Sequence, residues 1–346
     1  MVQIHAEKYI DFDEDAATSK IVLNAMISPD TSFQVHLSRS LSVIDAGSLS
    51  SISNAIVAVY DDSGVLVETL IEDYEDKDEF IALLKSGKYD QIRTVFHLGA
   101  CSDTTEWDGR YMMRDNFRFS RELYQHCGKR DIPFIYASSA AVYGAPSPKA
   151  SLDLTELFDE IEANERPLNM YGYSKLAFDQ YVRANAQERT NLVVGLRYFN
   201  IFGPGEAHKK SMASVVYNFN KQITSTGVIR VFRGSHGYPD GGHERDFVHV
   251  SDAINMTLWA SKLAASGSSI YNCGSGVART FNELARLVVD FHGKGKIDYI
   301  DFPEGLADSY QPCTKASMKR SKNIGYSNEF KTLETGVEEY LTWLNF

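Results

Sequence analysis

Residues 134–144 read FIYASSAAVYG and residues 167–175 read PLNMYGYSK, and together they contain the pattern of a strand and the start of a helix. The first begins with an apolar run over 134–137, which has the length of a buried strand, and continues into small and polar residues. The second leads into an amphipathic stretch over 174–186, which predicts a helix. A buried strand followed by a helix is the repeating unit of a parallel sheet, so we expect an α/β fold.

The same alternation of short apolar runs and amphipathic stretches continues on both sides. Further strands are predicted over residues 55–60, 94–98 and 192–197, and further helices over 78–84 and 117–128. The predicted strands end near small or polar residues, which suit a crevice at the carboxyl ends of a parallel sheet. The pattern predicts a doubly wound, mostly parallel sheet.

The pattern of short apolar runs and amphipathic stretches changes after Asn200. Longer loops with glycine and proline follow, including Gly203-Pro204 and the run YPDGG at residues 238–242. Such loops are typical of a smaller α/β lobe that binds substrate. We therefore expect three parts, which are an atypical N-terminal segment over 1–53, a cofactor and catalytic domain over 54–199, and mainly a substrate lobe over 200–346.

Composition and charge limit the classes of partner. The 346 residues are 43% hydrophobic and 23% charged, which is typical of a folded globular protein. The formal net charge of -11 gives no attraction for nucleic acid or anionic lipid, so neither is an expected partner. No apolar run approaches the roughly 20 residues of a membrane span, and the acidic N-terminus does not resemble a secretory signal. We expect a cytoplasmic protein.

The cysteines give no sign of a metal site or of disulfides. They are widely spaced and form no C-x-x-C pair. A chain of this size does not need disulfides for stability, so reduced thiols in a cytosol are expected. The four residues are Cys101, Cys127, Cys273 and Cys313.

Tyr171 and Lys175 form the strongest chemical signal, because a spacing of four places both side chains on one face of a helix. Such pairs usually lie on a solvated helix surface. Here Ser138 and Ser139 follow a predicted buried strand about thirty residues upstream, so three kinds of group converge. A lysine ammonium favours the phenolate of a nearby tyrosine, and a serine hydroxyl orients a substrate alcohol.

These residues resemble the extended short-chain dehydrogenase/reductases, a superfamily with a Rossmann-like fold. The resemblance places Ser139, Tyr171 and Lys175 on the catalytic triad and makes Ser138 a structural neighbour. The run TVFHLGACSDTTEWDG resembles the strand and loop that line the cofactor, which implies contacts from Ala100 and Asn116 as well as from Tyr171 and Lys175. One NADP or NAD for each subunit is implied.

Within that superfamily the chain resembles the ADP-glycero-manno-heptose 6-epimerase family. The resemblance rests on GACSDTTEWDGRYMM, PLNMYGYSK, HKKSMASV, YQPCTKASM and FKTLETGVEEYLTWLN, and it covers residues 55–346 with a short insertion around 145–166. It implies a homo-oligomer that oxidises C6 of an ADP-heptose and reduces it on the opposite face, for lipopolysaccharide synthesis. The implied substrate-binding residues are Ser139, Asn200, His208, Arg245 and Tyr310.

Lys209 has two interpretations. The run His208-Lys209-Lys210 is by charge alone a solvated basic turn. The family resemblance makes Lys209 the second acid/base, on the side of the sugar opposite Tyr171. Inversion at C6 requires a proton donor on that side, so we favour the catalytic interpretation.

The N-terminal segment departs from the family pattern. A dinucleotide-binding fold opens with a strand and a glycine-rich turn, because only glycine lets the backbone approach the pyrophosphate. The first 46 residues contain no glycine, although residues 21–23 suit a strand. Divergence to a pseudoenzyme, a sequence error and a rebuilt first βα unit all remain open. Asp61 or Asp62 could reach an adenosine ribose, or both could simply form a turn.

Three functions follow from these observations. The leading hypothesis is the heptose 6-epimerase, and its enzymatic alternative is another nucleotide-sugar 4-epimerase or dehydratase that does not use Lys209. The non-enzymatic alternative is a cofactor-deficient protein that binds a sugar nucleotide or acts as an assembly partner.

Overall fold

The protein is described here by a computed structural model. The described residues are 21–27, 33–39, 57–60, 66–70, 81–82, 85–86, 92, 94–145, 154–303 and 310–345. The chain divides into two compact units, Met1–Phe96 and His97–Phe346.

The described part of the first unit contains two antiparallel strand pairs. The first pair confirms the strand predicted over residues 21–23, but another strand follows it, where a βα unit would have a helix. The second pair contains the strand predicted over 55–60, and its partner is antiparallel. The helix predicted over 78–84 lies mostly outside the described residues. The pairs are β1 (Ile21–Ile27) with β2 (Phe33–Arg39), and β3 (Val57–Tyr60) with β4 (Leu66–Leu70).

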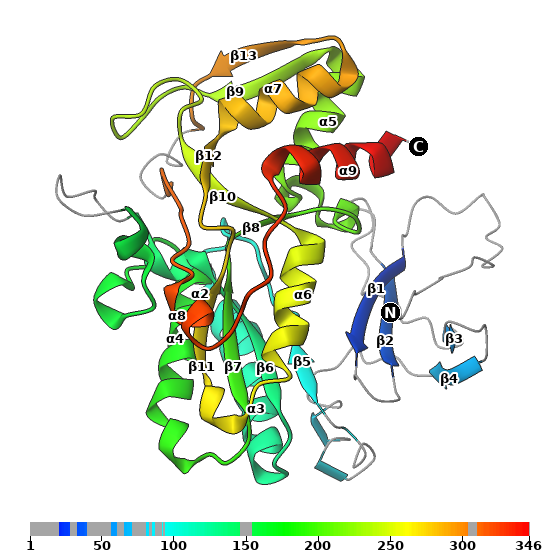
Figure 1. The fold of residues 1–346 in the computed structure, drawn as a ribbon, viewed down its shortest axis with the longest axis vertical. Helices are drawn as coiled ribbons and strands as arrows, with labels where there is room; N and C mark the ends of the chain where they lie inside the picture. Colours follow the sequence, from blue (N-terminus) through cyan, green and yellow to red (C-terminus); the bar gives the residue numbers. More distant parts are fainter. Residues whose placement is uncertain are drawn as a thin grey trace. The chain divides into compact units, whose positions relative to one another are not determined.

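The second unit is built on a parallel sheet, as the α/β prediction requires (Figure 1). Its order is β11-β7-β6-β5, and β7 runs parallel to both of its neighbours. Three of its strands fall on the apolar runs predicted over 94–98, 134–137 and 192–197, and the fourth, β11, was not predicted. The four strands are β5 (Val95–His97), β6 (Phe134–Ser139), β7 (Val193–Tyr198) and β11 (Ser269–Cys273).

Helices cover both faces of this sheet. Arg197 on β7 bonds to Asp179 on one helix, and the next residue, Tyr198, bonds to Thr257 on another. Successive side chains of a strand point to opposite faces, so these two helices lie on opposite sides. The helices of this half are α2 (Gly109–Met112), α3 (Phe119–Lys129), α4 (Met170–Ala184), α6 (Val250–Ala260) and α8 (Lys319–Asn323).

Short helical segments connect these elements. A π-helical segment, η1 (Met113–Arg118), leads directly into α3, so the helix predicted over 117–128 begins earlier than expected. The others are 3-10 helices: η2 (Ala140–Tyr143), η3 (Leu154–Phe158), η4 (Glu162–Asn164), η5 (Ala186–Glu188), η6 (Ala207–Met212) and η7 (Ala265–Gly267).

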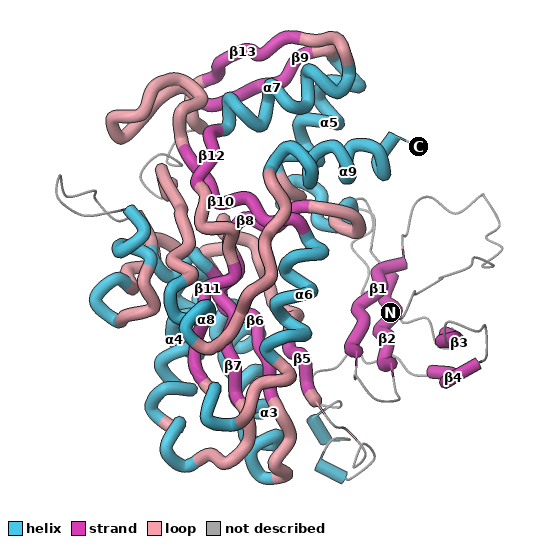
Figure 2. The backbone as a smooth tube through the Cα atoms, in the orientation of Figure 1, coloured by secondary structure: helices cyan, strands magenta, loops and turns pink. Residues whose placement is uncertain are grey.

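Most of the chain after residue 200 forms a second layer, drawn in the upper half of Figure 2. It has a three-stranded sheet of order β12-β10-β8 and a parallel pair of β13 with β9. Within the same sequence range, β11 returns to the first sheet. The elements are β8 (Asn200–Phe202), α5 (Val215–Thr226), β9 (Val228–Phe232), β10 (Glu244–His249), β12 (Ala278–Thr280), α7 (Phe281–His292), β13 (Lys296–Ile300) and α9 (Leu333–Asn345).

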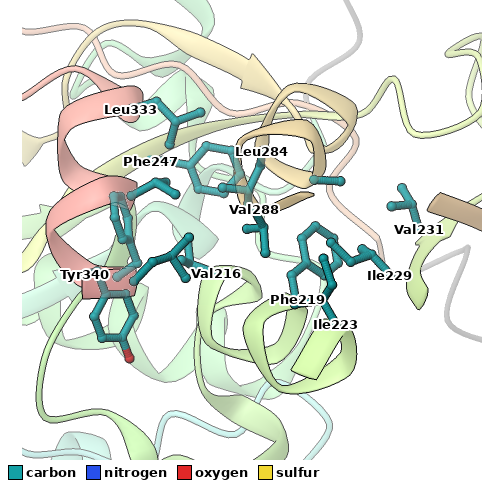
Figure 3. Packing of buried hydrophobic residues seen from close by; sticks show 14 residues of the cluster. Val216, Phe219, Ile223, Ile229, Val231, Phe247, Leu284, Val288, Leu333 and Tyr340 are labelled. Carbon is teal, nitrogen blue, oxygen red and sulfur yellow. The ribbon is translucent and has the colours of Figure 1, made fainter. Parts of the chain in front are cut away.

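A buried apolar cluster holds this layer together (Figure 3). Phe219 and Ile223 from α5 pack with Leu284 and Val288 from α7, and Tyr340 enters from α9. These positions recur three or four residues apart, so each helix presents one apolar face.

No helix of the described residues is long and apolar enough to cross a membrane. Among the same residues, no group of three or more potential ligand side chains is arranged to hold a metal ion. All four cysteines are free thiols.

Gly195 is required where β6 and β7 pair. It lies opposite Tyr136, and an added Cβ would approach the Cζ and Oη atoms of Tyr136 to 2.5 Å. The ring is 1% exposed and its hydroxyl is bonded to Asp179, so it has no space to move.

We predict that Gly195→Ala destabilises the protein by about 1–3 kcal/mol, because the methyl group overpacks a filled core. The matched control is Gly99→Ala, since a Cβ there would meet nothing within 4 Å. Denaturant unfolding of both variants tests this, and equal stability would contradict the packing account.

Candidate active site

Strand β6 places the two predicted serines in different surroundings. The Ser138 hydroxyl is buried and donates to the Asp179 carboxylate at 2.9 Å. Ser139 is the last residue of the strand and caps η2, where its Oγ accepts from the Ala141 N–H at 3.1 Å. Ser139 therefore turns toward the end of the sheet, and Ser138 is held in the structure beneath it.

Helix α4 begins just before the predicted catalytic pair. Asn169 caps it by accepting from the Gly172 N–H at 2.9 Å, which satisfies a free amide of the first turn. Tyr171 lies in that first turn, and Lys175 lies one turn later. The Lys175 ammonium is 6.0 Å from the centre of the Tyr171 ring and donates to the Ala137 carbonyl at 2.8 Å.

Burial controls the charge of both groups. It raises the pKa of the Tyr171 phenol, and a hydrogen bond with Ser139 opposes that rise. It also lowers the pKa of Lys175 to about 8. The pKa of Tyr171 therefore shifts upward, opposite to the lowering expected from the lysine, because desolvation disfavours the phenolate. Ser139 nevertheless lies close enough to the Tyr171 phenol to lower its pKa, and the Lys175 ammonium lies 6.0 Å from the centre of the Tyr171 ring.

The Asn116 side chain is occupied within the protein. Its Oδ1 accepts from the Cys101 N–H at 2.9 Å, and its Nδ2 donates to the Cys101 carbonyl at 2.9 Å and to Ser174 Oγ at 3.0 Å. Ser174 in turn donates to the Tyr171 carbonyl at 2.7 Å. Asn116 is 1% exposed, so it joins the loop after β5 to α4, with both amide protons already in use.

Two predicted substrate residues, Arg245 and Tyr310, lie together. The Arg245 guanidinium stands 4.8 Å from the centre of the Tyr310 ring and donates to the Glu244 carbonyl at 2.8 Å. Burial raises the pKa of Tyr310, and the arginine charge opposes this. The next residue, Gln311, donates to the Ala140 carbonyl at 3.4 Å, which connects this pair with the segment after Ser139.

The remaining predicted substrate residues lie in loops and short elements. Asn200 is exposed at the start of β8, and its Oδ1 accepts from Thr314 Oγ1 at 3.3 Å. Lys209 is exposed in η6, with its N–H bonded to the Glu206 carbonyl at 2.9 Å. His208 belongs to the same helix, and its side chain lies outside the described set.

The predicted cofactor residues are described only in part. Asp61 and Asp62 lie outside the described residues. Ala100 is half-buried in the loop after β5. At the neighbouring Gly99 an added Cβ would meet nothing within 4 Å, so this loop leaves open space at the carboxyl end of the strand. A nicotinamide cofactor fits a position beside that loop, because ligands of doubly wound sheets bind at these strand ends.

Sequence reasoning missed the buried ion pairs beneath the triad. Asp179 accepts from Arg197 Nε at 3.0 Å and Nη2 at 2.8 Å, and Glu165 bonds to both Arg197 and Arg183. Asp179 follows Lys175 by four residues, so its helical spacing could have revealed it. Glu165 comes from the insertion, and nothing in its local sequence indicates its partners.

A cavity of about 620 Å³ lies elsewhere in the second unit. Phe247 and Arg279 line it together with the segment before α9, and none of the predicted site residues does. The Arg279 guanidinium is paired there with Glu283 and Glu334.

Known proteins are similar to this chain in sequence and in fold. The chain is 52% identical to the ADP-L-glycero-D-manno-heptose-6-epimerase of Alkalilimnicola ehrlichii over 277 residues, which cover 80% of this chain and 83% of that protein. The crystal structure of the enzyme of that name from Helicobacter pylori matches with a TM-score of 0.65 and 29% identity, over 79% of each chain.

A more distant solved structure shares the fold alone. The UDP-glucose 4-epimerase of Thermus thermophilus, solved in complex with NAD, matches with a TM-score of 0.62 and 22% identity, over 79% of this chain and 84% of that one.

The model of the NAD dependent epimerase/dehydratase family matches residues 41–274, which is more than half of the chain. This protein therefore belongs to the NAD dependent epimerase/dehydratase family.

Proposed function

We propose that the protein is an ADP-L-glycero-D-manno-heptose 6-epimerase, which inverts C6 of an ADP-glycero-manno-heptose and so supplies heptose for lipopolysaccharide. The observation that carries the proposal is the meeting of Ser139, Tyr171 and Lys175 at the end of β6 and the start of α4. The 52% identity to a relative of that name supports the choice of substrate.

Bound nicotinamide, one NADP or NAD in each subunit, would supply the hydride acceptor that converts C6 to a ketone and then returns the hydride to the opposite face. Ala100 and the open space at Gly99 lie on the side of the site where it would bind. Tyr171 and Lys175 would also contact it. Asp61 or Asp62 would reach its ribose, and an acid there favours NAD over NADP.

Tyr171 takes the proton of the C6 hydroxyl during oxidation, and Ser139 orients that hydroxyl. Because burial raises the pKa of the phenol, the tyrosine depends on its hydrogen bond with Ser139 and on the charge of Lys175 to release its proton. With a pKa of about 8, Lys175 keeps its proton at neutral pH and loses it in mild alkali.

The substrate nucleotide is held by the second layer. Arg245 and Tyr310 form a cationic and aromatic pair suited to a diphosphate, which a protein of net charge -11 can attract only through local donors. Asn200 and His208 would contact the sugar nucleotide from β8 and η6. We further propose a cytoplasmic homo-oligomer, with a cofactor and catalytic domain over 54–199 and mainly a substrate lobe over 200–346.

One observation favours a second candidate, a sugar-nucleotide-binding protein without turnover. The first 46 residues lack glycine, and β1 pairs with the antiparallel β2, where the family pattern has a glycine turn and a helix. Such a segment would hold a pyrophosphate weakly, because close backbone approach is lost.

Tyr171→Phe should leave binding of ADP-heptose nearly unchanged and lower turnover by roughly 10²-fold or more, because it removes the acid/base and keeps the ring. Steady-state assays with added NADP or NAD measure this, alongside calorimetric binding. Equal turnover in the two proteins would reject the triad. No turnover in wild type, together with substrate binding, would favour the second candidate.

Lys209→Ala should abolish inversion at C6 while leaving the half-reaction that oxidises C6, because only the protonation on the opposite side needs it. Single-turnover formation of reduced nicotinamide and product epimer ratios separate the two steps. Exposed Lys221 on α5 provides the control Lys221→Ala. Full epimerisation in Lys209→Ala would favour a 4-epimerase or dehydratase that makes do with Tyr171.

Lys175 should impose a specific dependence of stability on pH. Its pKa falls from 10.5 to about 8 on folding, so between these values the unfolded chain binds more protons. The free energy of unfolding of the wild type, relative to Lys175→Met, should therefore rise from about pH 8 to about pH 10.5. Urea unfolding across that range measures it, with Lys221→Met as the control. Parallel curves for wild type and Lys175→Met would contradict it.

A further inference from the structure

Asp179 is the third member of a row on one face of α4. It follows Tyr171 and Lys175 at the same spacing of four residues, and it is 0% exposed. It has no part in the proton transfers described above. Its charge nevertheless acts on Lys175, and it bonds to Ser138, the residue before Ser139.

The row fastens three consecutive residues of β6 to the helix. Asp179 accepts from the Tyr136 hydroxyl at 3.0 Å and from the Ser138 hydroxyl at 2.9 Å. Between them, the Ala137 carbonyl accepts from Lys175 at 2.8 Å. The next residue along the strand is Ser139. These bonds therefore fix the position of the Ser139 hydroxyl relative to the Tyr171 side chain.

The same carboxylate is tied to β7. Arg197 donates to it from Nε and Nη2, and this guanidinium is 0% exposed. Arginine can only donate, and the Tyr136 and Ser138 hydroxyls complete four hydrogen bonds that converge on the carboxylate. Four donated bonds of this kind stabilise an ionised carboxylate.

The surroundings of Lys175 contain few opposing charges. Tyr171 and Asp179 lie one turn before and after it on the same helix, and Cys101 lies in the loop after β5. Tyr136 on β6 and Arg197 on β7 are both bonded to Asp179. Burial lowers the pKa of Lys175, and the charge of Asp179 is the largest influence that opposes it.

We propose that Asp179 is a positioning residue of the active site, which clamps the end of β6 onto α4 and supplies the negative charge that keeps Lys175 protonated. The clamp fixes the distance between Ser139 and Tyr171, and the charge preserves the cation that Tyr171 requires. The kinetic part of this inference rests on the proposed epimerase function, and the thermodynamic part does not.

Asp179→Asn and Glu165→Gln are a matched pair of variants. Each removes one buried negative charge beside Arg197. Only Asp179 also bonds to Tyr136 and Ser138 and faces Lys175. General destabilisation of the ion-pair network should therefore appear in both variants, and effects on the triad should appear in Asp179→Asn alone.

The thermodynamic test measures the free energy of unfolding against pH with and without Lys175→Met. It does so in the Asp179→Asn protein and in the Glu165→Gln protein. In Asp179→Asn the pH at which the difference in unfolding free energy begins to rise should move down by about one unit, because an opposite charge has been removed. In Glu165→Gln it should stay near the wild-type value. The same onset in both backgrounds would overturn the charge role, whether or not the protein has turnover.

The kinetic test uses Ser138→Ala and Tyr136→Phe, which keep every charge and each remove one bond of the clamp. Each should lower kcat about tenfold or more and change KM less than twofold, because substrate contacts remain. These variants also serve if Asp179→Asn does not fold. Unchanged kcat in both would overturn the clamp, and total inactivity of the wild type would instead reject the proposed function.

Discussion

The site depends on burying the Lys175 ammonium against the end of a strand. An ion removed from water costs several kcal/mol unless other groups compensate. Here the compensation is one carbonyl from β6 and the nearby charge of Asp179. The balance leaves Lys175 with a pKa of about 8, which is charged at neutral pH but only narrowly so. A change in any element that contacts Lys175 therefore also changes the fraction of Lys175 that is protonated.

That constraint explains why a buried ion-pair network lies beneath the triad. Asp179 alone would be a second buried ion, and Arg197 neutralises it from the neighbouring strand. Glu165 then balances Arg197 and pairs with Arg183 on the surface side. The insertion that contributes Glu165 thus completes a set of two cations and two anions. Removal of one member of this network should destabilise the protein more than replacement of the whole network by apolar residues, because it leaves a buried charge unpaired.

The sequence predicted the parts that depend on local pattern. Apolar runs predicted the strands over 94–98, 134–137 and 192–197. Periodicity predicted most of α4, which begins at Met170 and not at the expected residue 174. Pairings between distant residues were not predictable, because the contacts of Asp179 and Glu165 with Arg197 depend on how α4 and the insertion pack against β7. The antiparallel partner of β3 was missed for a different reason, since a strand pattern does not specify its neighbour.

Two residues adjacent in sequence, Tyr310 and Gln311, contact the two layers of the second unit. The layers therefore cannot move independently at this point. Tyr310 contacts Arg245 in the second layer, and Gln311 bonds to the Ala140 carbonyl just after Ser139. A peptide link is too short to let these two contacts move separately by more than a few ångströms. A shift of Arg245 on binding a diphosphate would therefore pull on the segment that carries Ser139. In the proposed enzyme, binding of the nucleotide and alignment of the sugar would be coupled through this connection.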